Sequence, residues 1–175
     1  MFKSTALMKL DTREIILFYS SLLSYSGTIH GDAHDCNLLV PNCEDPNNQD
    51  QRVCGVIDFN NMVEAPYVYE IGIAIAYTMI KSKNVDPMEV GGLMLAGYTR
   101  EMELSVEELE AVRICVAARF CQHYVLDSND NFINNLEPTT WFKNLWKILQ
   151  TFWKLPEDEV NSSWKNTIRT YKTVP

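Results

Sequence analysis

Apolar residues recur at helical spacing over most of the chain, and this pattern predicts a mainly helical protein. Residues 10–23 are expected to form a first helix, because apolar positions there recur three or four residues apart. Residues 67–83 are apolar on nearly every side, which is typical of a helix at the centre of a fold. From Pro66 onward we expect only helices, over residues 67–83, 87–101, 105–126, 139–155 and 158–171. The polar residues 127–138 are expected to form a loop.

Capping residues mark where several of these helices begin. Ser105 is followed three residues later by Glu108, a capping box. Thr139 or Thr140 can cap the next helix, and Asp158 the last. The aromatic residues of the 139–155 helix are interpreted as a packing face rather than a surface for stacking bases: Trp141, Phe142, Trp146, Phe152 and Trp153.

A β-hairpin is predicted over residues 38–57. Apolar runs at residues 38–40 and 52–57 flank a connection rich in turn-forming residues. A hairpin brings its two ends together, so Asn37 and Asp58 should lie side by side. After Phe59 the chain is expected to turn through Asn60 and Asn61, which tolerate left-handed backbone conformations. The predicted fold class is therefore α+β and mostly α-helical, with one domain over residues 1–175.

The composition narrows the possible partners. Apolar residues make up 46% and charged residues 22% of the chain, which is typical of a globular protein. The formal net charge of −8 argues against binding of nucleic acids or anionic membranes, because both need a basic face. The longest apolar run, residues 71–80, is shorter than the roughly 20 residues needed to cross a bilayer. A nucleotide would have to be held by a local device such as metal ions.

Cysteine usage indicates a reducing, cytoplasmic setting. The five cysteines are odd in number and contain no CxxC pair, and the start of the chain does not have the pattern of a signal peptide. Free thiols are therefore expected.

The candidate chemistry lies around the predicted hairpin. Asp32, Asn37 and Asp58 form the minimum set for magnesium-dependent phosphoryl transfer. In such sites the first Asp orients the attacking hydroxyl or accepts its proton, whereas the Asn and second Asp hold the metal that bridges the nucleotide phosphates. Each residue alone would usually be a turn residue or a strand end, so the combination carries the hypothesis. His30 is expected to tie the loop to the backbone near Asp58, and His34 is a candidate contact for phosphate or metal.

The segments His30–Asn37 and Val56–Phe59 resemble the aminoglycoside phosphotransferase and choline kinase superfamily, a branch of the protein-kinase-like fold. Within it the closer likeness is to the hydroxylysine kinases, through residues 55–59, 62, 68–70, 76–80, 90–92, 96–98 and 119–122. The resemblance implies transfer of the γ-phosphate of GTP or ATP to 5-hydroxy-L-lysine. It also implies that Asp32 is the base, that Asn37 and Asp58 bind Mg²⁺, and that these residues with His34 contact the nucleotide.

The sequence departs from the family pattern in two places. The family usually continues Asp-Phe-Gly-Asp, whereas Asp58 and Phe59 are followed by Asn60 and Asn61, and Asn60 would adopt the glycine conformation at some energetic cost. In addition, the 29 residues before His30 contain no glycine-rich loop and no β-rich pattern. The chain is therefore expected to be a kinase C-terminal lobe without its N-terminal β lobe, which binds nucleotide weakly and transfers phosphate poorly by itself.

Several alternatives stay open. The lobe could be a catalytically weak or inactive module that acts by binding. A metal-dependent hydrolase could use a cluster of His30, Asp32, His34 and Asp35. Within the kinase hypothesis, the acceptor could instead be choline, an aminoglycoside or a sugar, and a cationic acceptor could contact Glu64, Glu70 or Asp127. The sequence leaves the oligomeric state undecided.

Overall fold

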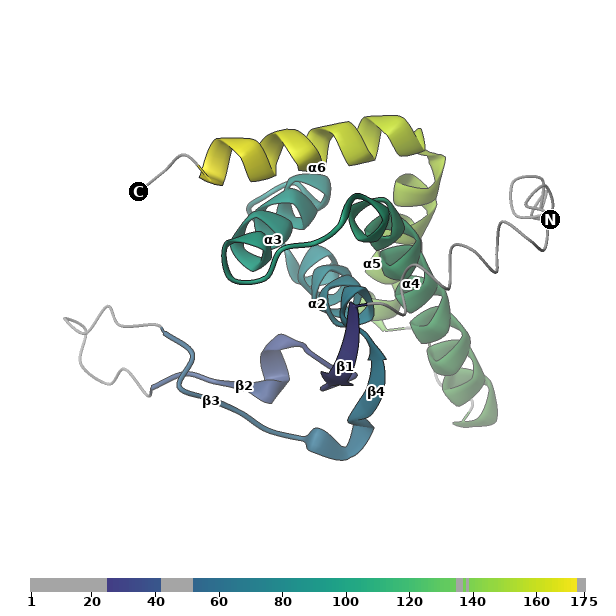
Figure 1. Ribbon diagram of the computed structural model, residues 1–175. Helices are drawn as coiled ribbons and strands as arrows, with labels where there is room; N and C mark the ends of the chain where they lie inside the picture. Colours follow the sequence, from purple (N-terminus) through teal and green to yellow (C-terminus); the bar gives the residue numbers. More distant parts are fainter. Residues whose placement is uncertain (1–24, 42–51, 135–136, 138, 173–175) are drawn as a thin grey trace, which may run out of the picture.

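Helices dominate the computed structural model (Figure 1), which describes residues 25–41, 52–134, 137 and 139–172. The helix expected over residues 10–23 lies outside the described residues. The described helices are α2 (Tyr67–Lys81), α3 (Pro87–Glu101), α4 (Val106–Asn134), α5 (Thr140–Lys154) and α6 (Glu157–Lys172). The predicted α+β, mostly helical class is confirmed, and so is the absence of strands after Pro66 within the described residues.

The hydrophobic core is built around α2, as its apolar pattern predicts. This helix packs against α3 and α4, and α6 lies across α3 (Figure 1). Val68, Ile75 and Met79 of α2 are fully buried. Phe120 of α4 and Phe152 of α5 are equally buried and meet edge to face, with ring centroids 5.9 Å apart. Apolar burial on this scale makes the helical core a rigid support for the loops beneath it.

The cap predictions are mostly confirmed. Ser105 Oγ accepts a hydrogen bond from the Glu108 backbone N–H, and Glu108 Oε2 accepts one from the Ser105 N–H, so the capping box is complete. Thr139 caps α5 by accepting from the Phe142 N–H at 3.2 Å. The prediction for Asp158 is wrong, because α6 already begins at Glu157 and Asp158 lies in its first turn.

The prediction of a loop over residues 127–138 is also wrong for its first residues. Helix α4 continues to Asn134, so residues 127–134 are helical. These residues are mostly polar but contain neither Gly nor Pro, and the backbone hydrogen bonds of the helix therefore continue without interruption. Ser128 fits into this helix by donating its hydroxyl hydrogen to the Tyr124 carbonyl oxygen at 2.6 Å.

The predicted hairpin is present. Strand β2 (Leu38–Leu39) pairs antiparallel with β3 (Gly55–Val56), and Leu38 lies opposite Val56. Beyond the strands, the Ile57 N–H donates to the Asn37 carbonyl oxygen at 3.0 Å. The backbones of Asn37 and Asp58 therefore leave the hairpin side by side, as expected.

A second antiparallel ribbon was not expected. Strand β1 (Ser26–Ile29) pairs with β4 (Val63–Pro66), so that Ser26 lies opposite Pro66 and Ile29 opposite Val63. Both strands are short, and neither has the alternation that marks a strand from sequence. This ribbon joins the start of the His30–Asn37 segment to the start of α2 and fixes where the loop begins (Figure 1).

The turn after the hairpin differs from the prediction in its backbone. Phe59–Asn61 form a short 3₁₀ helix, and the left-handed residue is Asp58, with φ 63° and ψ 65°. Asn60 therefore does not need the glycine conformation that the family comparison implied. A left-handed residue other than glycine is unfavourable by roughly 1–2 kcal/mol, so Asp58 is a strained position.

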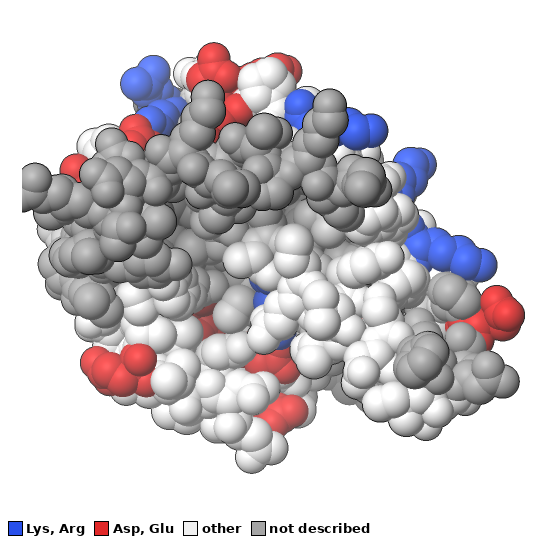
Figure 2. Space-filling model, turned by 90° about the vertical axis from the view of Figure 1, so that its right-hand side faces the viewer, with Lys and Arg blue, Asp and Glu red and all other residues white. Residues whose placement is uncertain are grey.

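Figure 2 shows how charge is distributed over one face of the molecule. On the face shown in Figure 2, acidic and basic side chains lie mostly around the rim, and uncharged residues occupy much of its described middle. None of the helices in the described ranges combines the length and the apolar character that a membrane crossing requires.

Candidate active site

The His30–Asn37 loop is fastened to its surroundings at both sides. His30 Nε2 lies 2.8 Å from the Ile57 carbonyl oxygen, which confirms the predicted tie to the backbone next to Asp58. The Gly31 N–H donates to Glu70 Oε2 of α2 at 2.9 Å. Gly31 is left-handed, with φ 76°, and packs against the Asn61 backbone. Glu70, weighed above as a contact for a cationic acceptor, anchors the loop through this bond, and its contact with an acceptor stays a prediction.

Asn37 is the buried polar residue at the end of the loop. Its side chain is 6% exposed, and its Nδ2 donates to the Asp32 carbonyl oxygen at 3.0 Å. The amide is therefore oriented by the loop itself, and its Oδ1 is left as a ligand atom. The segment Asp35–Asn37 is a single 3₁₀ turn, which brings Asn37 back beneath Asp32.

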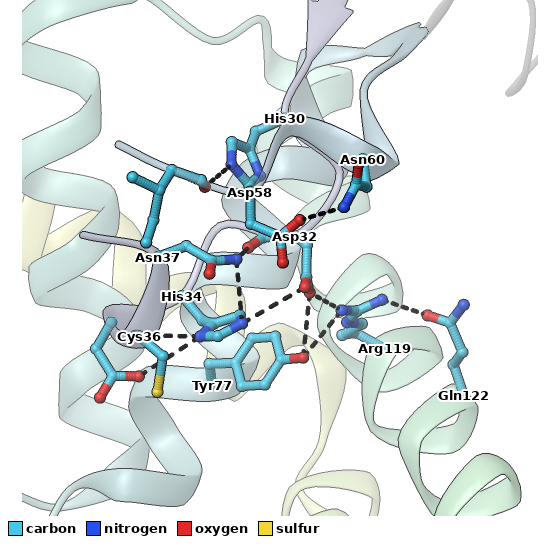
Figure 3. Close-up of polar contacts among 12 residues, drawn as sticks. His30, Asp32, His34, Cys36, Asn37, Asp58, Asn60, Tyr77, Arg119 and Gln122 are labelled. Carbon is cyan, nitrogen blue, oxygen red and sulfur yellow. Dashed lines mark hydrogen bonds and ion pairs between the residues drawn. The ribbon is translucent and has the colours of Figure 1, made fainter. Parts of the chain in front are cut away.

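Asp58 follows the other strand of the hairpin and is exposed. Its Oδ1 accepts a hydrogen bond from Asn60 Nδ2 at 2.9 Å, so Asn60 orients the carboxylate of the strained residue (Figure 3). An amide oxygen and a carboxylate on adjacent chain ends are the oxygen ligands that a hard divalent cation prefers. The donor set therefore fits Mg²⁺.

Asp32 lies in a network of side chains from the two central helices (Figure 3). Its Oδ1 accepts from Arg119 Nη2 of α4 at 2.5 Å and from Tyr77 Oη of α2 at 3.2 Å. Arg119 Nη2 also lies 3.0 Å from Tyr77 Oη, which closes a triangle of three polar groups. Burial is the main cause that raises the pKa of Tyr77, so its hydroxyl keeps its hydrogen as a donor.

Tyr77 and Arg119 are site residues that sequence reasoning missed. They lie 45 and 87 residues from Asp32 in sequence, and each belongs to a helix whose pattern indicates only packing. Arg119 is part of a family-like segment, but nothing in that segment indicates which residue it contacts. Only the tertiary packing of α2 and α4 reveals the cluster.

His34 faces into the loop. Its Nδ1 accepts from the Cys36 N–H at 3.2 Å, and its Nε2 lies 3.3 Å from Asn37 Nδ2. Nε2 lies 3.4 Å from Asp32 Oδ2, and the ring packs against Tyr77 with centroids 4.6 Å apart. Contact of His34 with phosphate or metal stays a prediction.

Of the four residues of the hydrolase hypothesis, His34 lies 3.4 Å from Asp32 and 3.9 Å from Asp35, whereas His30 and Asp35 are engaged by other partners. His30 is engaged by the Ile57 carbonyl group, and Asp35 forms an ion pair with Lys81 of α2. Burial opposes ionisation of Asp35, but the hydrogen bond and charge of Lys81 outweigh it and lower the pKa of Asp35. In the described ranges, a possible metal-ligand group comprises His34, Asp35 and Cys36, with ligand atoms within 4.8 Å of one another. Its acid is already neutralised by Lys81.

His123 lies behind the cluster as an ordinary, partly buried residue of α4. Its ring contacts Tyr77 and Trp141, with centroid distances of 4.9 and 5.5 Å. Burial, and then the charge of Arg119, lower the pKa of His123 to about 4. The ring is therefore neutral at pH 7 and adds no second positive charge beside Arg119.

Comparison with known proteins agrees with this arrangement. A model of the phosphotransferase enzyme family, named APH, matches residues 8–104, which is more than half of the chain and includes the His30–Asn37 loop, the hairpin and Asp58. The chain belongs to this family. The superfamily resemblance drawn from the sequence is thereby confirmed, and the family has a protein-kinase-like fold.

Curated relatives narrow the likeness. The chain is 32% identical to hydroxylysine kinase of Bos taurus over 153 residues and 33% identical to that of Xenopus laevis over 152 residues. It is also 33% identical to hydroxylysine kinase of Mus musculus over 148 residues. These matches cover 81–82% of this phosphotransferase-family chain but 39% of each relative, so the chain spans about two fifths of their length. No solved structure matches the chain.

Proposed function

We propose that this phosphotransferase-family chain carries the catalytic loop and metal ligands of a small-molecule kinase. The kinase would transfer the γ-phosphate of GTP or ATP to a hydroxyl of a hydroxylated amine, with 5-hydroxy-L-lysine as the first candidate. The names of the relatives support the acceptor class, and the family supports the reaction type. The hydrogen bond from the Ile57 N–H to the Asn37 carbonyl oxygen carries the proposal, because it brings the two metal-ligand candidates to one edge of the hairpin.

Mg²⁺ would be held by Asn37 Oδ1 and the Asp58 carboxylate. When bound, the ion would neutralise charge on the nucleotide phosphates, which an acidic chain cannot do with its bulk charge. The protein contributes two prepared oxygen ligands. Asn37 is fixed by its bond to the Asp32 carbonyl oxygen, and Asp58 by its bond from Asn60.

Asp32 would orient the acceptor hydroxyl and accept its proton. Because Arg119 and Tyr77 both donate to Oδ1, the second oxygen, Oδ2, is the one left for the acceptor. His34 Nε2 lies beside Oδ2 at 3.4 Å and limits the directions from which a hydroxyl can approach. Positioning of this kind is the main contribution that a protein makes to phosphoryl transfer.

One observation favours the alternative of a lobe that acts by binding. Large apolar side chains on and after the hairpin are 38–56% exposed: Leu38, Leu39, Val40, Val53, Val56, Ile57, Phe59, Met62 and Val63. Exposed apolar groups in such number mark a binding surface. Calorimetry with Mg²⁺ and GTP or ATP separates the two functions, since a kinase site must lose affinity in Asp58→Ala and a binding module need not.

The direct test is phosphate transfer from labelled GTP or ATP to a panel of hydroxylated amines, including 5-hydroxy-L-lysine, choline and an aminoglycoside. We expect slow transfer by the 175-residue chain that disappears in Asp32→Asn. Glu103→Gln, which neutralises an exposed acid away from the loop, is the matched control and should keep the wild-type rate. Transfer that persists in Asp32→Asn, or no transfer to any acceptor by the wild-type chain, would contradict the proposal.

A further inference from the structure

We propose that Arg119 and Tyr77 are positioning residues that hold the Asp32 carboxylate in the orientation needed for phosphoryl transfer. This inference rests on the proposed function, in which Asp32 handles the acceptor hydroxyl. The two residues are assigned a role toward Asp32 and none toward the nucleotide or the metal.

The geometry gives Asp32 Oδ1 two donors from rigid supports. Arg119 lies next to Phe120, and Tyr77 next to Ala76, and both neighbours are buried in the core with exposed fractions of 0% and 1%. The backbones of Arg119 and Tyr77 are therefore fixed by helix packing, whereas Asp32 lies in a loop. Two hydrogen bonds from the core to one carboxylate oxygen transfer this rigidity to the loop side chain.

The Arg119 guanidinium is itself held in orientation. Its Nη1 donates to Gln122 Oε1 at 2.7 Å, one turn further along α4, and its Cζ lies over the Tyr77 ring, 5.2 Å from the centroid. Its side chain is 13% exposed, so water competes little for the donors. A planar fork with several fixed donors can bridge Asp32, Tyr77 and Gln122 at once, which a lysine ammonium cannot do in the same plane.

A purely structural ion pair is the competing explanation. Buried pairs are poor indicators of stability, because desolvation offsets much of the attraction. A structural pair would change folding and leave the turnover of the folded enzyme alone. A positioning pair would lower kcat while leaving the KM for nucleotide unchanged, since neither residue is placed at the phosphates.

The test uses the phosphate-transfer assay on the full 175-residue chain. In Arg119→Ala we expect kcat to fall about 10- to 100-fold, the penalty typical of a misplaced catalytic group, with the nucleotide KM within about twofold of wild type. Added guanidinium should restore part of the rate to Arg119→Ala, and Arg119→Lys should retain more than Arg119→Ala. Arg169→Ala, an exposed arginine on α6, should behave as wild type.

A second variant keeps the test decisive if Arg119→Ala does not fold. Tyr77→Phe removes one hydroxyl and keeps the ring, and kcat should fall about fivefold, the equivalent of one hydrogen bond. Unfolding by urea of Asp32→Asn, Arg119→Lys and the double variant should be non-additive, which tests the contact without any activity.

The outcomes separate the two proposals. Transfer that survives Asp32→Asn would refute the proposed function. The positioning role would be overturned if transfer required Asp32 but Arg119→Ala kept the wild-type kcat. If Arg119→Ala does not fold, a wild-type kcat in Tyr77→Phe would overturn it. Additive effects in the urea cycle would overturn it as well, even in a chain with no measurable transfer.

Discussion

Replacement of Gly31 by Ala should disable the loop that carries Asp32. Gly31 has φ 76°, and a Cβ built on it overlaps the Asn61 backbone oxygen and lies 3.2 Å from the Asn61 carbonyl carbon. The contact is to backbone, which cannot rotate away as a side chain can. Either the loop or the Phe59–Asn61 turn must therefore move, and both flank the proposed metal ligands.

The size of the effect follows from two unfavourable contributions and one that opposes them. A left-handed alanine is unfavourable by about 1–2 kcal/mol, and a steric overlap with fixed backbone adds about 1–3 kcal/mol. The smaller entropy of the unfolded alanine chain returns about 0.4–1 kcal/mol. The free energy of unfolding should therefore fall by about 1–5 kcal/mol, and a loop displaced by about 1 Å should lower phosphate transfer roughly 100-fold.

Urea unfolding of Gly31→Ala beside Gly97→Ala measures this contribution. Gly97 lies on an exposed position of α3, and a Cβ there meets nothing within 4 Å. The same substitution should therefore raise the free energy of unfolding by about 0.5–1 kcal/mol. The reasoning would be refuted if the two variants were equally stable, or if Gly31→Ala kept the wild-type rate of transfer.

Three further predictions concern the helices. Phe152→Ala should lower the free energy of unfolding by about 3–5 kcal/mol in urea, because its side chain is 0% exposed, and a loss below about 1 kcal/mol would contradict the core assignment. Thr139→Ala removes the hydrogen bond accepted from the Phe142 N–H and should lower the free energy of unfolding by about 1 kcal/mol, whereas Thr140→Ala should have little effect. A larger loss of stability in Thr140→Ala than in Thr139→Ala would disprove the cap. Because burial lowers the pKa of folded His123 to about 4, only the unfolded chain takes up this proton between about pH 6.5 and pH 4. The stability from a neutral His123 is therefore complete above about pH 6.5 and declines toward pH 4, so the melting temperature of wild type should fall more steeply over this range than that of His123→Gln; equal slopes would exclude this contribution.

The sequence predicted those parts of the fold that depend on local pattern. The apolar character of residues 67–83 placed α2 at the centre, and the two apolar runs beside turn formers placed Asn37 next to Asp58. Strands β1 and β4 were missed because four-residue strands without alternation have no local signal. The continuation of α4 through residues 127–134 was missed because polar composition suggests a loop, although no residue there breaks the helix.

The residues of the candidate site likewise divide into those that local sequence pattern predicts and those that it does not. Asp32, Asn37 and Asp58 could be proposed from the sequence because their spacing along the chain reflects a loop and a hairpin. Arg119 and Tyr77 were not, because their contact with Asp32 is created by the packing of α2 against α4. From the sequence, the left-handed conformation was assigned to Asn60 and Asn61, because asparagine is common in turns. The structure places this conformation at Asp58.

Binding of Mn²⁺, as a paramagnetic substitute for Mg²⁺, tests the central claim most directly. Titration without nucleotide, whose phosphates would themselves bind Mn²⁺, is followed by loss of the free-ion signal in electron paramagnetic resonance. It should show saturable binding that weakens about tenfold or more in Asn37→Ala and in Asp58→Ala. Asp35→Asn, which alters the neighbouring His34–Asp35–Cys36 group, should leave this affinity unchanged. Equal Mn²⁺ affinity in wild type and Asp58→Ala, or loss of binding in Asp35→Asn alone, would contradict a metal site formed by Asn37 and Asp58.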